Sequence, residues 1–206
     1  VIEPDQREPV AQALGVDRLR DIDACALLKG ETFGDTTLQP SAYSTYLHRC
    51  RFGQGGFSSG SINLELGATI DRSRMSATGV RVAGQAVLQE STSSGCSRAV
   101  ASPSSPQQAI TLESSEDAGM CDHLTAALDL AVDKLRTDPP KQNLPDDSLA
   151  RADLCSLIDN QVVQQQLGVV QSKTADDLST CRIDAINGNG TLRAELTPAS
   201  TFGPEN

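Results

Sequence analysis

Six cysteines are the residues of this 206-residue chain whose type and spacing most directly suggest covalent chemistry. They are Cys25, Cys50, Cys96, Cys121, Cys155 and Cys181. Within successive pairs the separations are 25, 25 and 26 residues, whereas 46 and 34 residues separate one pair from the next. Six cysteines allow roughly 15 pairings, and the simplest prediction is three disulfides between sequential neighbours. Each bridge would stabilise the fold by about 3–4 kcal/mol in the loop-entropy model.

Metal ligation and free buried thiols are the alternatives for these cysteines. The sequence has no Cys-x-x-Cys pair, and His48 and His123 do not lie at zinc-finger spacing. We therefore predict no metal site and no cofactor. Disulfides form in an oxidising compartment, so we expect the cell exterior, the periplasm or the lumen of the endoplasmic reticulum.

A Gly-x-Ser-x-Gly pattern at residues 56–60 is the clearest sequence that resembles a catalytic motif. The nucleophile elbow of hydrolases needs a strand before Ser58 and a helix after it. Here a Gly/Ser-rich turn surrounds the serine and a strand is predicted to follow. Downstream of it, His123 falls in a predicted helix beside a cysteine. We interpret residues 56–60 as a hairpin loop and predict no catalytic residues, so the chain is not expected to be an enzyme.

Pairs of neighbouring acidic residues could act as general acids and bases. They are Glu116/Asp117, Asp146/Asp147 and Asp176/Asp177. Each pair falls in a predicted loop or helix start, which favours solvated or helix-capping roles. No EF-hand spacing surrounds them, and Asn189 begins a glycosylation sequon that we interpret as a turn.

Three arginines beside the repeated cysteines are the candidate ligand-binding residues: Arg49, Arg51 and Arg182. Several guanidinium groups at one end of a sheet could contact an anionic ligand. The alternative is that they are solvated strand residues paired with nearby acids.

Charge and hydropathy exclude some classes of partner. The formal net charge of −10 repels phosphate backbones, so no nucleic-acid partner is expected. No apolar stretch approaches the roughly 20 residues that span a bilayer. We expect any export signal or membrane anchor to lie before Val1. Aromatic residues make up 3% of the chain, so Leu, Val, Ile and Ala must build the core.

An internal repeat relates the two halves of the chain. Residues 23–28 align with residues 153–158 at an offset of 130, and residues 50–52 align with residues 181–183 at an offset of 131. Both halves then continue into a Gly-rich turn and an alternating strand, at residues 61–66 and 191–196. The second copy has no counterpart of Cys96, Cys121 or the helix that follows them, so we interpret it as a partial module.

The elements that must position these residues follow from periodicity and from turn residues. A short helix is predicted at 22–29, and strands at 47–52, 61–69, 80–90, 96–101 and 108–113. A long helix at 120–135 places Leu124, Leu128, Ala131 and Leu135 on one face. A helix pair is predicted at 149–158 and 160–167, closed by Gly168.

We predict an α+β fold, with an antiparallel sheet, flanking helices and disulfide staples. The predicted organisation is an N-terminal linker (1–19), a cysteine-paired module (20–137), a Pro-rich linker (138–148) and a partial second module (149–206). The second module is expected to pack on the first.

An ordered series of motifs runs along the chain: Asp23/Cys25/Leu27/Leu28, Cys50/Phe52, residues 82–86, Gly95-Cys96 and residues 121–135. This series resembles exported actinobacterial domains found as cell-envelope lipoproteins of unknown function. Related cysteine-paired modules resemble the extracytoplasmic sensor domains of receptor Ser/Thr protein kinases. The chain departs from the lipoprotein pattern because no lipidation cysteine lies near Val1.

This resemblance implies export, a location in the cell envelope or outside the cell, and no known catalysis. We expect a ligand-binding or sensing ectodomain, with the ectodomain of a membrane-anchored Ser/Thr protein kinase as one version. The alternative is a stand-alone envelope lipoprotein or secreted scaffold that binds a partner protein. Neither expectation specifies the envelope ligand or the protein partner.

Overall fold

The computed structural model describes residues 7–41, 47–53, 61–90, 95–115, 119–186 and 190–197. The helices are α1 (Val10–Ala13), α2 (Val16–Leu19), α3 (Ala24–Leu28), α4 (Met120–Thr137), α5 (Leu154–Leu157) and α6 (Asn160–Leu167), with a 3-10 turn at Leu149–Arg151. The strands are β1 (Thr32–Phe33), β2 (Thr36–Thr37), β3 (Arg49–Gly53), β4 (Ser61–Thr69), β5 (Met75–Val82), β6 (Gln85–Glu90), β7 (Cys96–Ala101), β8 (Gln108–Ser114), β9 (Val170–Ala175), β10 (Thr180–Ala185) and β11 (Thr191–Glu195).

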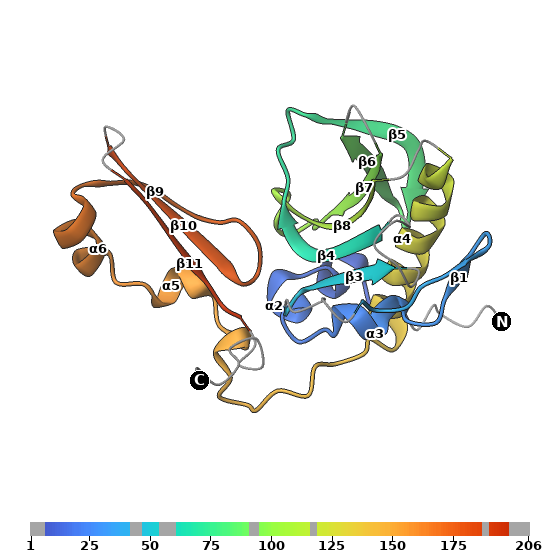
Figure 1. The fold of residues 1–206 in the computed structure, drawn as a ribbon, viewed down its shortest axis with the longest axis horizontal. Coiled ribbons are helices and arrows are strands. Elements are labelled where there is room, and N and C mark those ends of the chain that lie inside the picture. Colours follow the sequence, from blue (N-terminus) through green and yellow to red (C-terminus); the bar gives the residue numbers. More distant parts are fainter. Residues whose placement is uncertain are drawn as a thin grey trace, which may run out of the picture.

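Antiparallel sheets with helices beside them confirm the α+β prediction, and β1 and β2 form a separate two-stranded sheet beside the two main ones. The larger sheet has six strands in the order β3-β4-β8-β7-β6-β5, and the smaller has three in the order β11-β10-β9. In Figure 1 the larger sheet and α4 lie on one side, and the smaller sheet with α5 and α6 lies on the other. An extended segment after α4 connects the two parts (Figure 1).

The main core lies between α4 and the larger sheet. Leu124, Leu128, Ala131 and Leu135 are fully buried on the face of α4 that the sequence predicted. This helix packs mainly against β7 and β8, and α3 packs against β3. Buried aliphatic side chains of the larger sheet form the other side of this core. Close packing of these Leu, Ile and Val side chains fills the space without many aromatic residues.

The structure confirms three disulfides between sequential cysteines. Cys25–Cys50 joins α3 to β3, and Cys96–Cys121 joins β7 to α4. Cys155–Cys181 joins α5 to β10 in the smaller sheet. Each bond therefore ties a helix to the strand against which it packs. Three such bonds favour an oxidising, extracytoplasmic environment.

The prediction of one strand at 80–90 is wrong. Residues Ala83 and Gly84 turn the chain between β5 and β6, with φ angles of +46° and +84°. Two successive residues with positive φ are typical of a tight hairpin turn whose twist matches that of the strands. The sequence lacked the usual Asn-Gly or Asp-Gly signal, because alanine rarely adopts positive φ.

Two further expectations about local structure need correction. Residues 10–19, expected to be part of a linker, form α1 and α2, and their Ala13, Leu14 and Leu19 are buried in the main core. The single helix predicted at 149–158 is instead a 3-10 turn followed by α5. Apolar contacts with α4 and β4 stabilise the short N-terminal helices, and such long-range packing overrides weak local periodicity.

The internal repeat is visible in the geometry of both halves. Asp23 caps α3 and Asp153 caps α5, each accepting a hydrogen bond from the backbone N–H of the cysteine two residues later, at 2.9 and 3.0 Å. The hairpins that follow also correspond, because Cys50 pairs with Leu64 and Cys181 pairs with Ala194. The offsets of 131 and 130 residues between these positions are those found in the sequence.

The capping aspartates provide a first testable prediction. Asp23→Ala should lower the free energy of unfolding by about 1 kcal/mol, because the N–H groups of Cys25 and Ala26 both lose an acceptor. Asp153→Ala removes one cap bond, from the N–H of Cys155, and is expected to cost less. Urea unfolding of both oxidised variants at one pH would measure the two changes. Equal stability of Asp23→Ala and the wild type would contradict the assigned cap.

Candidate functional site

A buried leucine in the β9–β10 loop is one of the contacts between the smaller sheet and the larger one. Leu178 is 1% exposed and belongs to the main core, although its neighbours in sequence belong to the smaller sheet. It lies against Gly67, where a Cβ atom would come within 2.4 Å of the Leu178 side chain. Gly67 sits at an irregularity in the β4–β8 ladder and has a φ of +70°. A glycine here therefore satisfies both the backbone angle and the close approach.

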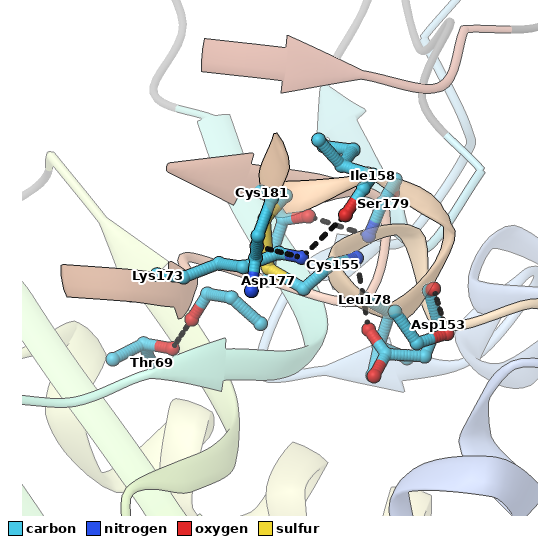
Figure 2. Close-up of a disulfide and its surroundings, with 12 residues drawn as sticks. Thr69, Asp153, Cys155, Ile158, Lys173, Asp177, Leu178, Ser179 and Cys181 are labelled. Carbon is cyan, nitrogen blue, oxygen red and sulfur yellow. Dashed lines mark hydrogen bonds between the residues drawn. A yellow bond between two sulfur atoms is a disulfide. The ribbon is translucent and has the colours of Figure 1, made fainter. Parts of the chain in front are cut away.

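Hydrogen bonds fix the same loop to the end of β4. The backbone N–H of Thr69 donates to the carbonyl of Asp176 at 2.9 Å, and its hydroxyl donates to the carbonyl of Ala175 at 2.6 Å. Figure 2 shows Thr69 beneath the loop that leads to Leu178 and the Cys155–Cys181 disulfide. The disulfide thus holds α5 to a strand that follows directly from the docked loop.

Arg20 joins three parts of the chain from a buried position. Its guanidinium donates to the carbonyl of Leu178 at 3.1 Å and to that of Ala152 at 2.5 Å. The Arg20 side chain is 4% exposed, and the Asp153 carboxylate lies 3.9 Å away. A buried cation must have such acceptors, because an unpaired one would carry a large desolvation cost. Arg20 therefore positions the loop rather than facing solvent.

A small polar cavity of about 90 Å³ lies where the two sheets meet. Its walls come from β3, β4, the β9–β10 loop and β11, and consist of His48, Arg49, Glu65, Asp177, Ser179, Arg193 and Glu195. The volume has room for a few water molecules but not for a drug-sized ligand. This cavity suits an electrostatic joint between the sheets better than a ligand site.

Two groups in this joint have shifted pKa values. Burial, helped by the charge of Arg20, lowers the pKa of His48 to about 4, while Asp177 acts in the opposite direction. Burial raises the pKa of Glu65, although Arg49 opposes this with an ion pair of 2.7 Å. His48 Nδ1 lies 3.4 Å from the Gln142 amide, and His48 Nε2 has no hydrogen-bond partner among the described residues. His48 is therefore neutral at pH 7.

The arginines proposed from the sequence do not gather into one anion site in the structure. Arg49 lines the joint and pairs with Glu65. Arg51 is exposed farther along β3. Arg182 lies on the smaller sheet and pairs with Asp184 at 3.1 Å. Arg49 and Arg182 thus have carboxylate partners of their own.

The other motif candidates are dispersed. Residues 56–60, with Ser58, lie outside the described residues, as do Glu116, Asp117 and Asn189. Asp146 pairs with Arg151 at 3.0 Å on the surface. Asp177 does reach the joint, where it accepts hydrogen bonds from Ser179 and Thr180. In the part of the chain that the structure describes, no group of three or more metal-ligating side chains could hold an ion.

A groove of about 500 Å³ lies between the β5–β6 hairpin and α4. A bulge opens it, because the β5–β6 pairing shifts register between Ala77 and Arg81. Bulges are common beside binding sites, since they redirect side chains. Apolar Val80 and Ala126 line the groove together with charged Arg98, Asp122 and Asp129.

Arg98 is the distinctive side chain of this groove. It is 9% exposed on β7, and its guanidinium donates to Thr125 Oγ1 at 3.1 Å, Gln89 Oε1 at 3.2 Å and the Ser97 carbonyl at 3.0 Å. All three acceptors are neutral, and among the described residues no carboxylate lies within ion-pair distance. Buried cations are normally paired with an anion. The sequence offered no signal for Arg98, because its hydrogen-bond partners lie on α4 and β6 as well as on its own strand.

No family model, curated protein or solved structure matches this chain. None of the helices formed by the described residues is both long enough and apolar enough to cross a membrane. The candidate site therefore depends on its own geometry: a groove of ligand size whose Arg98 has no carboxylate at ion-pair distance among the described residues.

Proposed function

We propose that this chain is an extracytoplasmic ligand-binding or sensing domain whose ligand occupies the groove between α4 and the β5–β6 hairpin. The observation that carries the proposal is Arg98, a nearly buried guanidinium that lines a groove of about 500 Å³ and has neutral acceptors. Sites for small molecules commonly have volumes of about 300–1,000 Å³. The three disulfides support a location outside the cytoplasm.

The charges of the groove favour a ligand that carries both a carboxylate and an amine. A carboxylate would accept hydrogen bonds from Nη2 of Arg98, because Nε and Nη1 already donate to Thr125, Gln89 and Ser97. Asp122 and Asp129 project from the same side of α4, seven residues apart, and both line the groove. They would attract an ammonium group. An amino acid or short peptide with free ends has this combination.

The sensing version places this domain outside a membrane anchor, with a Ser/Thr protein kinase on the cytoplasmic side. The groove borders α4, and α4 also packs against α1 and α3. A ligand that draws α4 toward β5 would therefore also displace the N-terminal helices α1 and α3, which pack against α4.

Calorimetry with defined probes would test the groove. The probes are alanyl-valine, its C-terminal amide and its N-acetyl derivative, each titrated into the oxidised protein. The free dipeptide should bind, and Arg98→Gln should weaken it about 10- to 100-fold, because a charge-assisted hydrogen bond is lost. The C-terminal amide should bind about as weakly to the wild type, since it lacks the carboxylate.

Matched variants separate the roles of the two charges. Asp122→Asn combined with Asp129→Asn should weaken the free dipeptide but leave the N-acetyl derivative unchanged, because that derivative has no ammonium group. Arg74→Gln is the control, since Arg74 pairs with Glu90 and does not line this groove. If none of the probes binds, or if Arg98→Gln binds the dipeptide as tightly as the wild type, the proposed site is wrong.

A further inference from the structure

β11 is the outer strand of the smaller sheet, and one row of its backbone groups faces away from β10. The order of that sheet places β11 at an edge (Figure 1). Leu196 donates to the carbonyl of Ser179 at 2.9 Å, and Ala185 donates to that of Gly190 at 3.0 Å. Because hydrogen bonding alternates along an antiparallel strand, the even-numbered residues of β11 face β10. The N–H and C=O groups of Thr191, Arg193 and Glu195 therefore point outward.

The larger sheet contains the internal template for this edge. β4 occupies the place that β11 has in the second copy, since Leu64 pairs with Cys50 as Ala194 pairs with Cys181. The outward groups of β4 are used by β8, which pairs Asn63 with Glu113 and Glu65 with Thr111. Among the described residues, no strand takes the part of β8 beside β11. By analogy with β8 beside β4, we expect an antiparallel strand to pair with the outer edge of β11.

We propose that the edge of β11 pairs with β11 of a second copy of this chain, in an antiparallel register centred on Ala194. In this register Arg193 and Glu195 of one copy lie opposite Glu195 and Arg193 of the other. Their outward backbone groups form the hydrogen-bonded pairs, as the geometry of the edge requires. The two cross-strand pairs have opposite charge, which stabilises neighbouring strands.

The side chains on the other face also match in this register. Leu192 of each copy lies opposite Leu196 of the other, and Ala194 lies opposite Ala194. Leu192 is 39% exposed in the single chain, because α5 and α6 contact mainly β9 and β10. Pairing would remove this apolar side chain from water.

The nearest competing register is disfavoured by charge. Centring the pair on Arg193 would also satisfy the backbone alternation, but it would place two arginines directly opposite each other. Like charges at opposed positions destabilise a strand pair. Within one chain Arg193 has weaker partners, with Asp176 at 3.8 Å and Glu195 at 4.0 Å. These carboxylates do not fix Arg193 in a geometry that excludes the intermolecular pair.

Sedimentation velocity of the oxidised wild-type chain, from about 10 µM to about 1 mM, tests the proposal. The expected result is a reversible monomer–dimer equilibrium. Arg193→Glu and Glu195→Arg should each weaken the dimer at least about 10-fold, because each places like charges opposite one another. The double variant restores opposite charges and should dimerise like the wild type.

Arg72→Glu serves as the matched control, since it makes the same charge change at an exposed position between β4 and β5, away from β11. It should dimerise as the wild type does, and circular dichroism should show every variant folded. A wild type that stays monomeric throughout overturns the second copy as occupant. A dimer that both single charge reversals leave unchanged overturns the β11 interface.

Discussion

Leu178→Ala should lower the free energy of unfolding by about 3 kcal/mol, within the range of about 2–5 kcal/mol for truncating a buried leucine. The side chain is 1% exposed and fills a position in the main core. The void cannot close easily, because Thr69 and Arg20 hold the loop in place through its carbonyl groups. Urea unfolding of the oxidised variant at pH 7 measures the loss.

The glycine opposite this leucine should be equally intolerant. Gly67→Ala places a Cβ 2.4 Å from the Leu178 side chain, at a φ of +70° that alanine rarely adopts. Backbone strain alone costs about 1–3 kcal/mol. Since either change disturbs one contact, the double variant should lose less than the sum of the single losses.

The control for this joint is Leu157→Ala, which truncates a leucine that is 53% exposed on α5. It should change the stability by less than about 0.5 kcal/mol. Hydrogen exchange should quicken in residues 176–181 of Leu178→Ala before it quickens in β7 and β8. A stability loss below about 1 kcal/mol for Leu178→Ala would show that the smaller sheet does not depend on this contact.

Acidification should destabilise the protein through His48. Its pKa falls from 6.5 to about 4 on folding, so the unfolded chain takes up a proton at a pH where the native protein does not. The contribution to stability is complete above about pH 6.5 and is lost as the pH falls toward about 4. A shift of this size corresponds to about 3 kcal/mol.

Glu65 acts in the opposite direction in the same joint. Burial raises its pKa, so the native state holds a proton that the unfolded state has released. This contribution favours the folded state in acid and is lost as the pH rises through the native pKa. The pH dependence of the wild-type free energy of unfolding therefore reflects the His48 contribution reduced by the opposing Glu65 contribution.

Substitutions separate the two groups. His48→Gln should flatten the fall in the free energy of unfolding between pH 6.5 and pH 4.5, whereas Glu65→Gln should make that fall steeper. Urea unfolding at several pH values, compared with the wild type, gives both slopes. An unchanged slope in His48→Gln would mean that another group is responsible for acid sensitivity.

Local features were predictable because their causes lie within a few residues. The helix at 120–135 was evident from apolar spacing, and it extends to Thr137 in the structure. The sequential disulfides followed from equal separations, since a cysteine on a short helix reaches the strand that packs on it. The internal repeat found in the sequence corresponds to the same strand register in both hairpins, β3–β4 and β10–β11. The boundary between β5 and β6 was missed because Ala83 carries an uncommon backbone angle.

The joint and the groove were decided by tertiary structure. Leu178 meets Gly67 across 111 residues, from position 67 to position 178, and no short-range periodicity indicates which leucine fills a gap above a glycine. Arg98 depends on Gln89 and Thr125 from two neighbouring elements, and on a bulge that opens the wall beside it. The sequence alone determined the cysteine framework, the duplicated hairpin and the α+β class, because hydrophobic period and chain spacing act locally. Only the folded chain decided which charges became buried, because desolvation depends on neighbours that are distant in sequence.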